Sequence, residues 1–597
     1  MLALLDQWNA QLAKHPRLAG GLLFLVAFVV YQKTLAGLFV FDDIPQILEN
    51  PFITNLHLWP RIFQGSVWSF RGPEEHDNFY RPLQFVVYWL LDRLAGPRPA
   101  VFHFFHLLFY AATVWLVFRL GRELLGNHLT AFVGALLWAL HPLHVEPVSW
   151  LSALPDVGSG YFYIWAFLLF LRAEKAESHR AARHGLAALA YFPALFFKEM
   201  ALSFPLLLLT YGFFFPSDEP RARRAGRWAL YLVPVVVYAI IRIVALGRLS
   251  EAPRFWQISW RMLAGAVGLL GQHAKLFFWP THLSPYRTFE LGASLRSPWP
   301  WLTLVALLAT MCWLRRREPV FSFLVAWWAV TLVPCLDTRQ IASLSVGDRF
   351  SYLPSVGLCL AGALAALRWL PRRLPRLEPA AVVTPGLGVI MCLWAVQDLR
   401  VSPQWHDNVT TWNYSLQASP DSPLVHLFQA ALLENRDADF DGAAREYEVA
   451  LRLNQASFRP APGITYDCYL GLGRIALHHG WWEEGIRYYN QAVRVAPSHS
   501  PAYRALGAAY FPRGDYAKAA SYFVQAVKFN PQDVEARFFL GTCWLKLGKP
   551  REAAAQFRAA REVDPTYDQA FEAEARALEA AGDTAEAARV RSLKSKP

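Results

Sequence analysis

The stretch RLAGGLLFLVAFVVYQKTLAGLFVFDDIPQ, residues 17–46, decides the fold class of this 597-residue chain. Its apolar run is long enough to cross a bilayer and ends in two adjacent carboxylates, Asp42 and Asp43. The run lacks a small-residue cleavage site and therefore predicts an uncleaved membrane anchor. Adjacent like charges repel each other, and a bilayer edge is a costly place for them, so the doublet calls for a functional explanation.

The composition supports a membrane protein. Hydrophobic residues make up 54% of the chain and charged residues 17%, with 42 Phe, 24 Trp and 23 Tyr. The net charge of +12 comes from short basic clusters between apolar runs, which indicates membrane orientation and argues against nucleic-acid binding. The six cysteines are scattered without a CxxC pair, so neither a zinc site nor a disulfide framework is predicted.

Apolar segments alternate with basic loops up to about residue 400. We expect eleven spans, near 18–40, 100–121, 129–147, 157–171, 185–197, 200–215, 228–247, 298–314, 319–334, 351–370 and 382–398. The basic loops should face the cytoplasm, and they contain Lys14, Arg17, Arg172, Lys175, Arg180, Arg183, Arg221, Arg223, Arg224, Arg227, residues 315–317, Arg372, Arg373 and Arg376. This orientation requires segments 83–95 and 262–279 to be interfacial or re-entrant. Eleven crossings then leave everything after residue 400 outside.

The C-terminal part is a repeat array. Prolines recur every 34 residues at Pro497, Pro531 and Pro565, and glycine and alanine positions share that period. A 34-residue period with small residues at helix contacts is the tetratricopeptide signature. We therefore predict a junction at 401–420 and four to five repeats at 421–597. Their groove would take an extended peptide, and a plain docking or dimerisation scaffold is an equally open interpretation.

Polar residues gather at the predicted outer ends of the spans. Besides the doublet they are Arg81, His103, His106, His141, His144, Glu146, Asp156, Lys198, Glu199 and Arg349. Each has a simpler interpretation: His103 and His106 as interfacial residues, Lys198 and Glu199 as an ion-paired turn, and Arg349 as a headgroup anchor. His141, His144 and Glu146 could instead form a metal site, although His141-Pro142 interrupts the helix there.

These residues stand in motifs that resemble one family. FDDIPQILENPFI, YRPL, FHFFHLLFY, HPLHVEPVSWLS, KEMALSFPLLLL, DRFSYLPSVG and WHDNVTTWNYSLQASP are similar, in order, to the transmembrane and tetratricopeptide-repeat protein O-mannosyltransferases and their bacterial relatives. The resemblance implies an all-α chain, with a GT-C glycosyltransferase domain of about eleven helices at 1–400 before the repeat solenoid. It also implies transfer of a sugar, most often mannose, from a polyprenyl- or dolichyl-phosphate carrier to Ser/Thr hydroxyls on the outer face.

Such a transfer needs a base for the acceptor proton and positive charge for the departing phosphate. The resemblance assigns Asp42 as the base and Asp43 to holding the loop or positioning the acceptor, with the reverse order left open. Arg349 is the first phosphate candidate, followed by Lys198 and His106. The sugar or carrier pocket would include His103, His141, His144, Glu146, Asp156, Glu199 and Arg81. One base acting in one displacement predicts inversion at the anomeric carbon.

The chain departs from the family pattern in two places. Leu154-Pro155 stands before Asp156 where the family usually has a basic residue, and Asp348 stands where a Glu is more usual. A phosphate leaving group without a diphosphate requires no cofactor, although a divalent metal is compatible with it.

Partners and location follow from the same resemblance. The expected partners are a lipid-phosphate sugar, an acceptor protein held by the repeats, and membrane lipids. The expected location is a bacterial inner membrane with periplasmic repeats, or the endoplasmic reticulum with lumenal repeats in a eukaryote. Two alternatives remain: a non-enzymatic scaffold for envelope assembly, and a ligase or polymerase that joins glycan to glycan.

Overall fold

The computed structural model describes residues 2–71, 78–247, 259–336, 345–369, 379–457, 460–565 and 567–594. The chain divides into two compact units, whose main boundary falls between Asp421 and Ser422. Regular structure in the described residues is helical apart from two-residue strands, β1 (Arg287–Thr288) and β2 (Ser345–Val346). These strands pair antiparallel, with Arg287 opposite Val346. The predicted all-α class is confirmed with this small exception.

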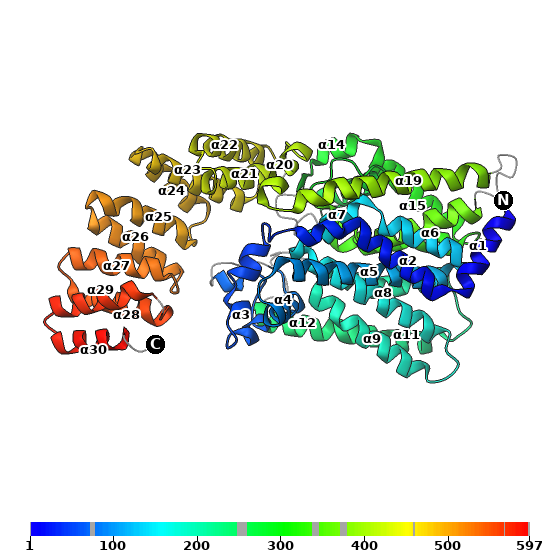
Figure 1. Cartoon of the computed structure of the whole chain (residues 1–597), viewed down its shortest axis with the longest axis horizontal. Coiled ribbons are helices and arrows are strands. Elements are labelled where there is room, and N and C mark those ends of the chain that lie inside the picture. The colour runs from blue at the N-terminus through cyan, green and yellow to red at the C-terminus, as the bar shows by residue number, and fades with distance from the viewer. Residues whose placement is uncertain are drawn as a thin grey trace. The chain divides into compact units, whose positions relative to one another are not determined.

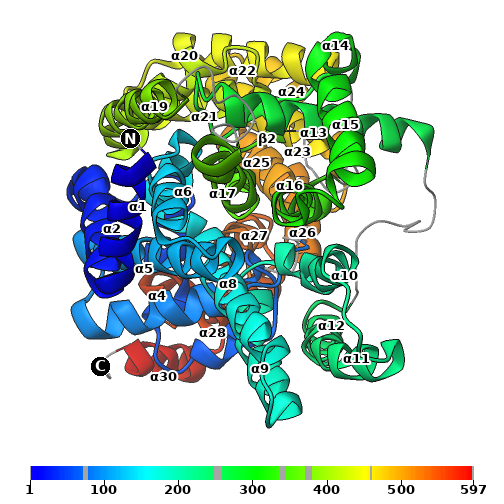
Figure 2. The same ribbon diagram turned by 90° about the vertical axis from the view of Figure 1, so that its right-hand side faces the viewer.

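The first unit is a helical bundle (Figures 1 and 2). Its N-terminal half contains α1 (Leu2–Lys14), α2 (Pro16–Tyr31), α3 (Pro51–Thr54), α4 (Pro82–Ala95), α5 (Pro99–Leu125), α6 (His128–Ala139), α7 (Val145–Ser149), α8 (Leu154–Glu174), α9 (Arg180–Phe197) and α10 (Phe204–Phe214). It continues with α11 (Arg221–Trp228), α12 (Leu232–Leu246), α13 (Trp260–Phe278), α14 (Leu291–Arg296), α15 (Pro298–Ala309), α16 (Pro319–Leu332), α17 (Ser355–Leu364), α19 (Pro379–Val401) and α20 (Asn408–Ala418). Helices α2, α5, α6, α8, α16 and α17 pack against one another around buried aromatic rings.

Several helices are apolar enough for a membrane. By length and composition, four described helical stretches could cross one: Pro16–Ala36, Pro99–Leu125, Leu151–Glu174 and Ala222–Leu246. A fifth arises if the bent pair His128–Ala139 and Pro142–Ser149 counts as one span. The predicted number of eleven spans is therefore not confirmed, because many of the other apolar helices are short. The basic residues Arg372, Arg373 and Arg376 lie outside the described residues.

The bend after α6 creates the irregular segment that carries much of the candidate site. The helical path bends by 54° between His128–Ala139 and Pro142–Ser149. His141 precedes a proline, which disfavours helical backbone before it, and Pro142 has no N–H to continue the helix. The chain instead forms three short turns, η5 (Pro142–His144), α7 and η6 (Leu151–Ala153). Polar side chains of this segment consequently face the interior of the bundle.

The second unit is a row of five helix pairs (Figure 1). They are α21 (Pro423–Asn435) with α22 (Phe440–Ala456), α23 (Pro462–His478) with α24 (Trp482–Val495), α25 (Ser500–Tyr510) with α26 (Tyr516–Phe529), α27 (Val534–Lys546) with α28 (Pro550–Val563), and α29 (Asp568–Ala580) with α30 (Thr584–Lys594). The periodic glycines explain the close approach within pairs. Gly507 and Gly541 lie against the rings of Phe523 and Phe557, where no side chain would fit without displacement.

We expect Gly541→Val to destabilise the second unit by about 1–3 kcal/mol because of overpacking. A Cβ at this position would lie 2.9 Å from the Phe557 ring. Gly463→Val is the matched control, since a Cβ on this exposed helical glycine would meet nothing within 4 Å. Protease sensitivity of the repeats during heating of the full chain measures the difference, and equal melting of both variants would contradict this packing.

Candidate active site

Asp43 ties the end of the first apolar run to the bent segment. Its carboxylate is fully buried and accepts three hydrogen bonds. One oxygen accepts from the backbone N–H of Val40 at 3.1 Å, and the other from the N–H and hydroxyl of Ser152 at 2.7 and 2.6 Å. Both oxygens are thus engaged in the interior of the unit. This geometry suits a side chain that holds the loop, one of the two roles predicted for Asp43.

Asp42 differs from its neighbour because its side chain is only partly buried. The preceding residue, Phe41, has a left-handed backbone with φ of 51°. Its ring contacts Trp150 and Trp412 at centroid distances of 5.7 and 5.0 Å, and its N–H donates to the Asn408 side chain at 2.7 Å. These contacts compensate an uncommon conformation for a bulky residue. The loop therefore buries Asp43 fully and leaves Asp42 partly exposed.

The structure predicts a pH-dependent contribution from Asp43. Burial raises the pKa of its carboxyl to about 7, although the Ser152 and Val40 hydrogen bonds oppose that rise. The folded chain then keeps a proton that the unfolded chain releases, so stability should fall as pH rises from about 4 to about 7 and level off above. Asp43→Asn should remove that decline, whose limit is roughly 4 kcal/mol. Thermal unfolding across this pH range measures the slope. Asp92→Asn on α4 is the control and should keep the wild-type slope; an unchanged slope in Asp43→Asn would contradict the assignment.

Arg349 lies at the centre of the candidate site, in the turn η12 (Asp348–Ser351). Its guanidinium and backbone N–H both bind Glu146 of α7, and 17% of its side chain is exposed. It packs over the rings of Trp150 and Phe350 at 5.1 and 5.0 Å. Burial alone would lower the pKa of Arg349, but its attraction to Glu146 raises the pKa above the ordinary value. The guanidinium therefore stays charged and has further N–H donors beyond those that Glu146 takes.

Two more cations lie near Arg349. Lys198 forms a buried ion pair with Asp156 at 2.5 Å, and its amine lies 5.1 Å from the Phe350 ring that also contacts Arg349. Burial lowers the pKa of Lys198; Asp156 opposes this effect, whereas Arg81 and Arg349 add to it. Arg81 forms its own ion pair with Glu199 at 2.8 Å. Three cations from separate segments therefore share one electrostatic environment, each with an acid partner. The simpler interpretation of Lys198 and Glu199 as an ion-paired turn does not hold, because Lys198 pairs with Asp156 and Glu199 with Arg81.

Tyr286 lies near both the Asp42-Asp43 loop and Arg349. The sequence did not identify it as a site residue. Burial and then the Asp42 carboxylate raise the pKa of its hydroxyl, while Arg349 lowers it. Its ring lies 5.7 Å from the Arg349 guanidinium and 6.0 Å from the Phe41 ring. Asp42 and Arg349 therefore both affect the pKa of this phenol, in opposite directions. No motif marks this residue, since it lies in a loop far from both in sequence.

The four predicted histidines are buried and bonded within the bundle. His106 contacts the Pro147 carbonyl at 2.7 Å, His103 the Leu38 carbonyl at 3.4 Å and His141 the Phe277 carbonyl at 3.1 Å. His144 contacts the Ser355 hydroxyl at 3.0 Å. These contacts fasten the irregular segments to neighbouring helices. A phosphate contact for His106 stays a prediction.

The metal interpretation of His141, His144 and Glu146 has no geometric support. Within the described residues, no three His, Cys, Asp or Glu side chains are arranged to hold an ion. Glu146 faces Arg349 instead. Asp348, the departure from the usual Glu, pairs with Arg287 and accepts the Ser284 N–H at 3.0 Å, which anchors the turn carrying Arg349.

Comparison with known families supports the repeat assignment. Tetratricopeptide-repeat family models match residues 470–534 and 512–581. Among solved structures, the chain has a partial likeness to MamA and to YrrB, a TPR protein. MamA is 20% identical over 29% of this chain and 89% of that chain, with a TM-score of 0.25, and YrrB is 22% identical over 31% and 90%, with a TM-score of 0.26.

The fold and site thus define a membrane protein that carries tetratricopeptide repeats. A Caenorhabditis elegans protein, protein O-mannosyl-transferase F38B6.6, is 20% identical over 467 residues, which cover 72% of this chain and 62% of that protein. Human protein O-mannosyl-transferase TMTC1 is 32% identical over 162 residues, or 26% of this chain and 18% of that protein. The chain is therefore similar to proteins named protein O-mannosyl-transferases, as its motifs predict, and it spans less than two thirds of the length of these proteins.

Proposed function

We propose that this chain is a membrane glycosyltransferase that moves mannose from a polyprenyl- or dolichyl-phosphate carrier to Ser/Thr hydroxyls of proteins. The observation that carries the proposal is the position of Tyr286, whose ring lies 5.7 Å from the Arg349 guanidinium and 6.0 Å from the ring of Phe41, the residue before Asp42. A base and a phosphate-binding cation around one point are the two groups that the transfer requires. The names of the relatives supply the reaction class and the sugar.

In this mechanism Asp42 takes the proton of the acceptor hydroxyl as its oxygen attacks the anomeric carbon. The bond from that carbon to the carrier phosphate breaks, and the phosphate leaves with the bonding electrons. Arg349 binds the leaving phosphate, while Lys198 and Arg81 contribute positive potential from the same neighbourhood. A single displacement inverts the anomeric configuration.

The other predicted residues have supporting roles in this proposal. Glu146, Asp156 and Glu199 hold the three cations in place while the site is empty of donor. Four histidines hold the segments around the site in place through their bonds to backbone and side-chain oxygens: His103, His106, His141 and His144. We further propose a GT-C type arrangement for residues 1–400, outward-facing repeats that recruit the acceptor protein, and a bacterial inner membrane as the location.

One assay separates this function from its alternatives. Purified full-length protein is incubated with polyprenyl-phosphate mannose, with and without a Ser/Thr peptide, and carrier release is followed together with peptide mass. Transfer to the peptide supports the proposal. Transfer to an added glycan with no peptide product would favour a glycan ligase or polymerase, and an intact donor in every arm would favour a scaffold.

A further inference from the structure

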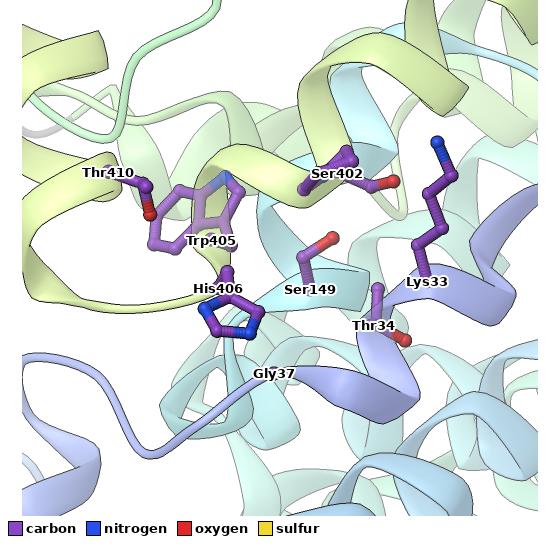
Figure 3. A pocket seen from close by; sticks show the side chains of 9 residues that line it. Lys33, Thr34, Gly37, Ser149, Ser402, Trp405, His406 and Thr410 are labelled. Carbon is purple, nitrogen blue, oxygen red and sulfur yellow. The ribbon is translucent and has the colours of Figure 1, made fainter.

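A cavity lies beside the candidate active site, between η1 (Gln32–Ala36), which follows α2, and η15 (Ser402–Trp405), which follows α19 (Figure 3). Its volume is about 340 Å³. Lys33 and Thr34 form one side, Ser402 and Trp405 the other, and Ser149 of α7 lies between them. None of these residues has a role in the proposed transfer.

Two buried hydroxyls at this cavity lack hydrogen-bond partners. Ser149 and Ser402 are 1% and 2% exposed, and neither Oγ atom is bonded. In Figure 3 both hydroxyls point toward the side of the cavity on which the Lys33 side chain lies. An unbonded buried hydroxyl costs free energy, so two of them at one cavity indicate a place prepared for a ligand with acceptor atoms.

The charge of the lining favours an anion. The nine lining residues include Lys33 and His406 and four hydroxyl side chains, and none of the nine is an acid. The carboxylate of Asp407, which follows the lining residue His406 in sequence, is engaged by His406 at 3.1 Å and by the backbone N–H of Thr410 at 2.9 Å. An ammonium and several hydroxyls are suitable donors for the oxygens of a phosphate group.

We propose that this cavity binds a phosphate group, held by Lys33, Ser149 and Ser402. A phosphorylated lipid would add apolar contacts, because Trp405 and Pro403 line the cavity and the apolar helices α2 and α19 end beside it. Free phosphate offers the same oxygens without those contacts. The site is distinct from the Arg349 cluster: Trp150 lies between them, with its ring 5.8 Å from Trp405 on one side and 5.1 Å from the Arg349 guanidinium on the other.

Binding of phosphate in the cavity should stabilise the loop that carries Asp42 and Asp43. The N–H of Leu38 donates to the His406 carbonyl at 2.8 Å, and the N–H of Phe41 donates to Asn408 at 2.7 Å. The segment that contains the lining residue His406 therefore also binds the loop that carries Asp42 and Asp43. A bound phosphate should slow hydrogen exchange of the amides in residues 37–43.

The test measures binding of two probes, inorganic phosphate and dihexanoyl phosphatidic acid, to the full chain in detergent micelles by isothermal titration. We expect saturable binding, reduced about tenfold by Lys33→Gln and by Ser402→Ala, since each removes one donor to a charged group. Lys14→Gln changes another exposed lysine, on α1; it is the matched control and should bind as wild type. Ser402→Ala should leave thermal stability unchanged or raised, because the hydroxyl it removes has no partner.

The two probes separate the sources of the phosphate. Tighter binding of the lipid assigns the site to a membrane phospholipid, and equal binding assigns it to free phosphate. Absence of saturable binding, or equal affinities in wild type, Lys33→Gln and Ser402→Ala, would overturn the proposal. The experiment measures binding alone, so its result does not depend on whether the protein has transferase activity.

Discussion

Asp42→Asn should abolish transfer to the acceptor while donor binding remains. The amide keeps the shape of the side chain but cannot accept the proton of the attacking hydroxyl. A positioned base contributes about 10²–10⁴-fold in rate, so the loss should fall in that range. Asp42 fits this task better than Asp43 because Asp42 is only partly buried, whereas Asp43 is fully buried and accepts hydrogen bonds from Val40 and Ser152 in the interior.

Three variants make this expectation specific. Asp42→Glu keeps the carboxylate and should retain part of the activity, whereas Asp43→Asn should weaken the loop and cause a milder loss. Asp92→Asn, a change of the same type on α4, should transfer normally. Turnover of the lipid donor in the presence of peptide is measured for each purified protein. Normal transfer by Asp42→Asn would exclude it as the base, and a larger loss in Asp43→Asn would move that role to Asp43.

Arg349→Lys should lower turnover by about 10²-fold, a loss comparable to that of one transition-state donor. Lysine keeps the positive charge that neutralises Glu146, so the fold should survive. It cannot, however, offer the planar set of N–H groups with which a guanidinium binds both Glu146 and a phosphate. Arg349→Ala is the less informative variant, because it leaves the buried Glu146 carboxylate without its partner.

Arg287→Lys is the control for Arg349→Lys. Arg287 pairs with Asp348, the neighbour of Arg349, so it tests the same turn without removing the proposed phosphate ligand. Its turnover should stay near the wild-type value. Comparable losses in both variants would show that the turn matters only for structure, and unchanged turnover in Arg349→Lys would shift phosphate binding to Lys198.

Local sequence patterns predicted the helical repeats and the polar residues at the ends of the apolar helices. The 34-residue spacing identified the repeats because Gly473, Gly507 and Gly541 each lie against an aromatic ring of their own helix pair. The outer-end polar residues were also identified, and the structure brings Arg81, Lys198 and Arg349 into one electrostatic environment.

Long-range pairing could not be predicted in the same way. Ser152 lies 109 residues after Asp43, and Tyr286 belongs to no motif, so nothing local reveals their contacts. Lys198 pairs with Asp156 and not with its chain neighbour, since adjacent side chains in extended backbone diverge. Span counting was limited for a related reason: hydropathy locates apolar segments, but prolines and irregular turns shorten several of them below a bilayer's thickness.

The anomeric configuration of the sugar on the acceptor peptide tests the central claim most directly. Wild-type protein is supplied with polyprenyl-phosphate mannose of known configuration and a Ser/Thr peptide, and the product is analysed by nuclear magnetic resonance. Direct displacement with Asp42 as the single base predicts a mannosyl peptide of inverted configuration. A retained configuration would contradict the single displacement, and the absence of any mannosyl peptide would contradict the proposed function itself.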